Sequence, residues 1–268
     1  MSKFFQIVKY TLYDLIHQKS FFVLLGVSVG FVLLLRGCYS GNYVVNGKAL
    51  DNVTVAWHAS IVAFHIVAAG VLLIATVLSM NLFRRDNEDG TVQYMLSKPV
   101  SRIAYAFGRA LGVWLVAFAF MFVLHLTIFI ITLVSAGGTM PGYLAASCLC
   151  SMNVLFVVLL VCLLSLFMPD FAAAFAGVVV AGISFIADSV FHAAQSTLVQ
   201  SVMAHQPIHA PPWAAAWPKV CSLQYYAVSL IKGGDFHSIG PVHPVIVMTV
   251  YLCLAAAGLA LAFQRKEI

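Results

Sequence analysis

The chain has 268 residues, of which 62% are hydrophobic and only 9% are charged, and its formal net charge is +5. A soluble domain carries about a quarter charged residues, so this composition excludes an ordinary soluble protein and predicts an integral membrane protein. No basic stripe with interleaved aromatic residues lies outside the apolar segments, so the positive charge does not indicate a nucleic-acid partner.

The first segment, residues 1–19, is predicted to be an amphipathic helix in the plane of the lipid head groups. At 100° per residue most of its apolar side chains gather on one side, opposite Lys3, Asp14 and His17. A basic amphipathic helix directly before a span usually lies at the membrane interface. The alternative is that this segment is simply the start of the first span.

Uncharged runs long enough to cross a bilayer follow, because an α-helical span needs about 20 apolar residues. They predict six transmembrane helices, at 20–36, 57–83, 104–135, 142–167, 171–188 and 244–263. A turn containing Gly and Pro separates the third and fourth spans. The predicted fold class is an all-α integral membrane protein with a single domain over residues 1–268.

The distribution of Lys and Arg predicts the orientation. With both termini in the cytoplasm, ten of the 14 basic residues fall on cytoplasmic segments and four on outer segments. The positive-inside rule therefore places the N-terminus, the loop at 84–103 and the tail at 264–268 in the cytoplasm of a bacterial-type inner membrane.

The outer segment at 189–243 is less loop-like than its position suggests. The stretch from Val220 is predicted to form a short helix that ends at Gly233 and Gly234, within or on the outer leaflet. Cys38 and Cys221 are both predicted on the outer side, where they could pair or remain as two free thiols.

Span five carries small residues at four-residue intervals, Ala173, Gly177 and Ala181. Such a ridge lets another helix approach closely, so we expect it to pack inside the bundle or at a dimer interface.

The nine histidines raise a haem or metal alternative. His58 and His65 share a face of the second predicted span, and His125 lies on the third, but His58 is expected at the outer end and His125 near mid-span. Axial haem ligands need matched depth, so this remains an alternative hypothesis. No grouping of Ser, His, Cys and Asp has a catalytic context, and we expect no enzyme activity from this chain alone.

The loop at 84–103 holds seven of the chain's 23 acidic and basic residues. Residues 86–89 are acidic and turn-prone, and Gly90 frees the backbone. The stretch from Thr91 to Ser97 can form two helical turns, which Pro99 ends, and Ser101 is placed to cap the next helix.

This loop resembles a signature of the ABC-2-type transporter permeases. The matching residues are Glu88, Gly90-Thr91, the run Val92 to Leu96, Ser97-Lys98-Pro99-Val100-Ser101-Arg102 and Gly108-Arg109. The resemblance extends over the whole chain, including the interfacial helix, the six spans and the outer excursion, and it is nearest the subfamily of the nitrous-oxide-reductase maturation permease. It implies an ABC-2 (type V) exporter-like fold.

The resemblance also implies partners. Family members form homodimers, and each permease docks a separate ATP-binding subunit through this loop, the coupling helix. The docking residues would be Glu88, Gly90, Thr91, Val92, Tyr94, Met95, Leu96, Ser97 and Pro99. The residues that contact lipid or the partner would be Arg84, Arg85, Lys98 and Arg102. No phosphate-binding G-x-x-x-x-G-K-[ST] motif occurs in this chain, so ATP and Mg are expected on the partner subunit, with no cofactor bound here.

The interpretation is a permease subunit of a homodimeric ABC complex that exports an unidentified substrate. Polar residues inside the spans are candidates for the pathway: His65, Thr76, Asn81, Thr127 and Asn153. The alternative within the class is mechanotransmission, in which ATP work passes to an extracytoplasmic partner through the outer segment and nothing crosses the membrane.

Overall fold

The computed structural model describes residues 3–17, 19–34, 37, 44–45, 48–49, 52–97, 100–136, 140, 142–194, 213, 216–234, 236 and 242–265. Cys38, Lys98 and Pro99, which the sequence analysis singled out, lie outside the described residues.

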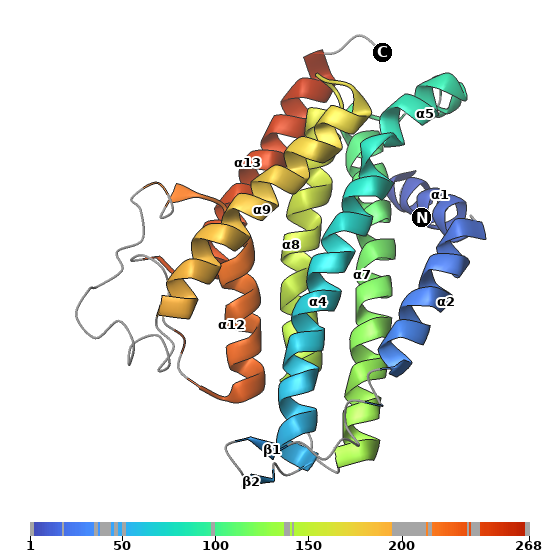
Figure 1. Ribbon diagram of the computed structural model, residues 1–268. Helices are drawn as coiled ribbons and strands as arrows, with labels where there is room; N and C mark the ends of the chain where they lie inside the picture. Colours follow the sequence, from blue (N-terminus) through green and yellow to red (C-terminus); the bar gives the residue numbers. More distant parts are fainter. Residues whose placement is uncertain are drawn as a thin grey trace.

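Helices make up nearly all of the described structure (Figure 1). Two short strands, β1 (Val44–Val45) and β2 (Lys48–Ala49), pair antiparallel at one end of the bundle, which we call the hairpin end. The helices are α1 (Lys3–Ile16), α2 (Lys19–Leu34), α4 (Asn52–Met80), α5 (Leu82–Glu88), α6 (Thr91–Leu96), α7 (Arg102–Ala136), α8 (Tyr143–Leu164), α9 (Asp170–Ala194), α12 (Val220–Lys232) and α13 (Pro244–Arg265).

Five segments of the described chain are long and apolar enough to cross a bilayer, and the bent pair α1–α2 would make six. The five are Val53–Glu88, Arg102–Val134, Tyr143–Leu164, Asp170–Asp188 and Pro244–Arg265. The predicted class, an all-α membrane protein, is confirmed. The segment from Val53 runs on to Glu88, beyond the predicted span limit at residue 83, because the charged residues after it remain helical.

The centre of the bundle consists of α4, α7 and α8, which pack against one another (Figure 1). Fully buried side chains such as Phe64, Val113, Met121 and Val158 fill the space between them. On one side α9, α12 and α13 cover this centre, and on the other side lie α1 and α2. The end that carries α5, α6 and the end of α13 is called the loop end below.

Helix α1 is bent by 68° from α2 and lies beside α7, near the loop end (Figure 1). Its buried residues, Ile7, Val8, Thr11 and Leu15, recur at three- and four-residue intervals and therefore share one face. That face packs against α7. A bend of this size is inconsistent with one straight helix through both segments, and the position of α1 at the membrane interface stays a prediction.

Helix α12 begins inside the bundle and runs towards the hairpin end, so it does not cross the whole bundle. Its first carbonyl, at Val220, accepts a 2.8 Å hydrogen bond from Asn153 Nδ2 in the middle of α8. Its last turn lies against Gly142 at the start of α8, where a Cβ would collide with the Leu230 carbonyl. As predicted, the helix ends at Gly233, whose φ of 63° suits glycine.

The structure corrects the expected position of Lys219 in an outer loop. Lys219 directly precedes α12 and is 2% exposed, and it forms an ion pair with Asp188, which was expected at a span end. The reason is that α9 continues to Ala194 and carries Asp188 inside the bundle, beside the start of α12.

Candidate functional site

The charged loop consists of two short helices at an angle to the span. Asn81 interrupts the long helix, with φ −109° and ψ 14°, and α5 follows. Asp89 ends α5, and Gly90 reverses the chain in the left-handed region at φ 68°. This corrects the predicted turn at 86–89: these residues are helical through Glu88, and the turn itself is confined to Asp89 and Gly90.

Helix α6 has one buried residue among those described and a polar exposed side. Val92 is 2% exposed and belongs to the hydrophobic core, whereas Tyr94 is 63% exposed. The Ser97 hydroxyl donates to the Tyr94 carbonyl at 2.8 Å and closes the last turn. Thr91 begins the helix, and Met95 and Leu96 complete it. The Ser101 side chain then accepts a 3.2 Å bond from the Ala104 N–H, which caps α7 as predicted.

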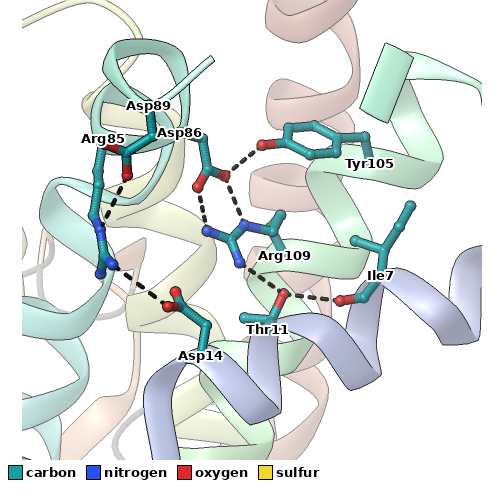
Figure 2. Close-up of polar contacts among 8 residues, drawn as sticks. All are labelled: Ile7, Thr11, Asp14, Arg85, Asp86, Asp89, Tyr105 and Arg109. Carbon is teal, nitrogen blue, oxygen red and sulfur yellow. Dashed lines mark hydrogen bonds and ion pairs between the residues drawn. The ribbon is translucent and has the colours of Figure 1, made fainter. Parts of the chain in front are cut away.

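A buried ion pair fixes α5 to the bundle (Figure 2). The Asp86 carboxylate accepts hydrogen bonds from Arg109 Nε, at 2.7 Å, and from Arg109 Nη2. The Tyr105 hydroxyl donates to the same carboxylate. Asp86 is 3% exposed, Arg109 is 2% exposed and Tyr105 is fully buried. Such a two-pronged arginine–carboxylate pair is stronger and more directional than a single contact.

The same arginine holds the interfacial helix. Arg109 Nη1 donates to Thr11 Oγ1 at 3.1 Å, and Thr11 donates in turn to the Ile7 carbonyl at 3.0 Å (Figure 2). One guanidinium thus joins α1, α5 and α7. Thr11 of α1 precedes Arg109 by 98 residues in the chain, and Asp86 of α5 precedes it by 23 residues. We call Thr11, Asp86, Tyr105 and Arg109 the loop-end cluster.

Two glycines of α7 allow α1 to approach this closely. A Cβ on Gly108 would lie 2.8 Å from Ile7 Cγ2, and one on Gly112 would lie 2.5 Å from Thr11 Cβ. Small residues four apart on one helix commonly create such a close contact in membranes.

Exposed ion pairs surround the cluster. Arg84 contacts Glu88 at 2.8 Å and Asp170, at the start of α9, at 3.5 Å. Arg85 lies 3.4 Å from Asp14 of α1 and 3.6 Å from Asp89. Each such pair contributes about 0–1 kcal/mol because water screens it. Arg102 is exposed at the start of α7.

The five candidate pathway residues do not form one group. Thr76 is buried and donates to the Leu72 carbonyl, Thr127 donates to the Val123 carbonyl, and Asn153 holds the start of α12. The His65 ring lies 5.1 Å from the Tyr225 ring, and Asn81 is exposed at the break before α5. The two threonines bond within their own helices and Asn153 joins α8 to α12, and the pathway remains a prediction.

The ridge of small residues lies partly inside this one chain. Ala173 is fully buried, and a Cβ on Gly177 would lie 2.6 Å from Val161 Cγ2 of α8. Ala181 is half-buried. At least the first part of the ridge therefore packs α9 against α8.

No group of three or more His, Cys, Asp or Glu side chains that could hold a metal occurs among the described residues. His58 contacts the Thr54 carbonyl through Nδ1 at 2.8 Å, and buried His125 contacts the Ser147 hydroxyl at 2.8 Å and stacks on Phe64. Cys221 is buried with a free thiol. Ordinary packing accounts for the contacts of these side chains.

Sequence reasoning missed most of the loop-end cluster. Of its four members only Arg109 was part of the recognised pattern, and Asp86 was assigned to an exposed turn. A signal was present: Asp86 lies four residues after Leu82, so in a helix both face the bundle, and Arg109 is a charge about two turns inside an otherwise apolar helix.

The protein is thus a bundle of apolar helices with a helical charged loop, and Arg109 connects this loop to α1. No curated protein matched this chain. A family model described as ABC-2 family transporter protein matches residues 3–267, nearly the whole chain. The chain therefore belongs to the ABC-2 transporter family and is the membrane-spanning permease component of an ABC transporter.

Proposed function

We propose that α5 and α6 form the docking surface for a separate ATP-binding subunit and that this permease works as a homodimer in export. The observation that carries the proposal is the two-sided character of α6: Val92 is held in the core while Tyr94, and Glu88 just before it, project into solvent. A loop that merely connected two spans would need neither a core contact nor a left-handed glycine.

The loop-end cluster supports a mechanical role for α5 and α6. A force on α6 reaches α5 through Gly90, and Asp86 connects α5 to Arg109 of α7. Arg109 bonds Thr11 of α1, and Arg84 reaches Asp170 at the start of α9. Rigid-body movement of packed helices is a common way to switch a transporter between states. We infer that ATP-driven closure of two partner subunits tilts the bundles through these contacts.

The charge distribution supports a cytoplasmic position for the loop end. Arg84, Arg85 and Arg102 lie there, together with Arg265 at the end of α13. By the positive-inside rule this end faces the cytoplasm, where ATP is available to the partner. We propose the cytoplasmic membrane of a bacterial-type cell as the location and leave the exported substrate open.

The test is co-purification from the native membrane with gentle detergent, followed by mass spectrometry. A stoichiometric ATP-binding subunit is expected with the unaltered chain, and the same spectra identify any partner on the outer side. Glu88→Lys reverses a charge on the proposed surface, and Tyr94→Ala removes its exposed aromatic ring, so both variants should lose the ATP-binding subunit. Gly90→Pro should do the same, because proline fixes φ near −65° where 68° is needed.

The matched control is Tyr13→Ala. Tyr13 is 64% exposed, against 63% for Tyr94, but lies on α1. This variant should keep the partner. If Glu88→Lys and Tyr94→Ala both retain stoichiometric ATP-binding subunit in a folded chain, the loop is not the docking surface.

A further inference from the structure

A cavity of about 460 Å³ opens between the interfacial helix and the span that leads to the charged loop. Residues of α1, α2, α4, α5 and α7 line it, together with Asn81 at the break between α4 and α5. Its lining residues are Asp14, Leu15, Phe21, Leu73, Ile74, Val77, Leu78, Met80, Asn81, Leu82, Arg85 and Arg109. Nothing in the docking proposal uses this space.

The cavity changes from polar to apolar along its length. Arg85, Asp14 and Asn81 lie at the loop end, whereas Val77, Ile74 and Leu73 lie progressively deeper along α4. From Leu73 to Arg85 the helical rise is about 18 Å at 1.5 Å per residue, roughly the depth of one leaflet. This gradient matches an amphiphile that stands in the leaflet at the loop end with its head group at the surface.

The deep part of the cavity is accessible from the bilayer. Leu73 is 54% exposed and Val77 is 57% exposed, although both lie on a transmembrane segment. Phe21 of α2 and Leu15 of α1 form the opposite wall. A flexible hydrocarbon chain can therefore enter sideways, without any opening of the helix bundle.

The polar end offers one cation with unused hydrogen-bonding capacity. Arg109 is committed to Asp86 and Thr11, but the contacts of Arg85 to Asp14 and Asp89 are 3.4 and 3.6 Å long. Close arginine–carboxylate contacts measure about 2.7–2.9 Å, so these two leave N–H groups of Arg85 for another acceptor. Figure 2 shows the Arg85 side chain lying between the two carboxylates. A phosphate oxygen is the acceptor that a guanidinium best fits at the membrane surface.

We propose that this cavity is a phospholipid site, in which Arg85 binds the phosphodiester and an acyl chain lies along Leu73, Val77 and Leu78. The lipid would fill the angle between α1–α2 and α4–α5, next to the loop-end cluster. The inference does not depend on the docking of an ATP-binding subunit, because it concerns only this chain and the surrounding leaflet.

The test uses the full chain, purified in detergent, stripped of lipid and titrated while native mass spectrometry follows the first bound molecule. Three probes separate the chemistry: dioleoylphosphatidylglycerol carries phosphate and chains, dioleoylglycerol carries only chains, and inorganic phosphate has no chains. We expect a defined first binding step with the phospholipid alone. Equal binding of dioleoylglycerol would overturn the role of Arg85, and equal binding of inorganic phosphate would overturn the role of the apolar wall.

Two matched pairs of variants locate the site. Leu78→Trp fills the cavity, whereas Ile66→Trp adds the same ring to an exposed position of α4 outside it. Arg85→Gln removes the proposed phosphate ligand, whereas Arg84→Gln removes a neighbouring charge that does not line the cavity. We expect Leu78→Trp and Arg85→Gln to weaken the first binding step about tenfold, the loss of one hydrogen bond to a charged group in the case of Arg85. Their controls should bind normally.

Equal affinities within both pairs would overturn the proposal. A second outcome would also overturn the proposal: the delipidated chain is a dimer that binds no phospholipid, and Leu78→Trp dissociates this dimer. A second copy of the chain would then occupy the cavity. Elution as a single folded species by size exclusion identifies variants fit for the comparison, and the arginine pair remains informative if a tryptophan variant fails to fold.

Discussion

Two buried ion pairs, one at each half of the bundle, solve different structural problems. At the loop end, Asp86 receives two bonds from the Arg109 guanidinium and one from Tyr105. In the other half, Asp188 lies 3.5 Å from the Lys219 ammonium and uses its second oxygen to accept from the Ser222 N–H at 2.9 Å and the Ser222 hydroxyl at 2.8 Å. The first pair joins three helices through a rigid fork, whereas the second chiefly caps a helix.

The capping role of Asp188 explains why its contact with Lys219, at 3.5 Å, can be longer than the 2.7 Å contact between Asp86 and Arg109. The first N–H groups of a helix lack intrahelical partners, and within the membrane water cannot supply them. Ser184 Oγ accepts from the Cys221 N–H at 3.3 Å, and Asp188 accepts from the next N–H, so α9 satisfies the buried start of α12. Negative charge there also suits the helix dipole. Asp188 therefore keeps stabilising partners without Lys219, whereas among the described residues Asp86 is the carboxylate that is hydrogen-bonded to Arg109.

The largest effect is expected when the loop-end pair is broken. Asp86→Asn keeps the shape of the side chain but leaves the Arg109 charge buried without its hydrogen-bonded counter-charge. Breaking a buried pair in this way costs about 3–5 kcal/mol of the free energy of unfolding. The measurement is denaturant-induced unfolding in mixed micelles. Glu88→Gln is the control, since its ion pair with Arg84 is exposed and contributes at most about 1 kcal/mol. Equal costs for the two variants would show that Asp86 is not buried in an ion pair.

The next effect tests the fork itself. Arg109→Lys retains the charge but replaces a planar group with five donors by a point charge, so the two-pronged bond and the contact to Thr11 are lost. We expect a loss of about 1.5–3 kcal/mol, one hydrogen bond between charged groups.

Arg85→Lys provides the comparison for that variant. The Arg85 side chain is 48% exposed and its two ion pairs are long, so the change should stay within about 0.5 kcal/mol. If Arg109→Lys changes the free energy of unfolding as little as Arg85→Lys does, the two-pronged geometry of Arg109 contributes nothing beyond its charge.

The contrast between the two pairs also shows what sequence can and cannot predict here. Uncharged runs predict the spans because length and hydropathy are local properties, and Gly233 predicts the end of α12 for the same reason. Neither pair is local. Asp86 follows two arginines and precedes Asn87, a composition typical of a turn, and its partner lies 23 residues later on another helix.

Asp188 was assigned to the end of a span because a charge normally closes an apolar window. Its partner Lys219 is separated from it by residues 189–218, so only the three-dimensional arrangement brings the two together. The coupling-helix prediction had a different source: the motif from Glu88 to Arg109 indicated the family, but the pairing of Arg109 with Asp86 becomes apparent only in the fold.

The smallest effect is expected for Lys219→Met, which tests whether Asp188 acts mainly as a cap of α12 or as the counter-ion of Lys219. Lys219→Met removes the ammonium but leaves Asp188 bonded to the backbone N–H and the hydroxyl of Ser222, so we expect a loss of only about 1 kcal/mol. Asp188→Asn should cost more, because it weakens the cap of α12 and leaves the Lys219 charge buried. The unfolding free energies of the two variants in the same micelles give the order directly.

If Lys219→Met costs as much as Asp86→Asn, the second pair holds its helix by charge attraction, as the first does, and the distinction between the two pairs is wrong. If the order is as expected, α12 is held at its buried end by hydrogen bonds from α9 that survive the loss of the lysine. Movements of α9, driven from Arg84 and Asp170 at the loop end, would then carry the start of α12 with them.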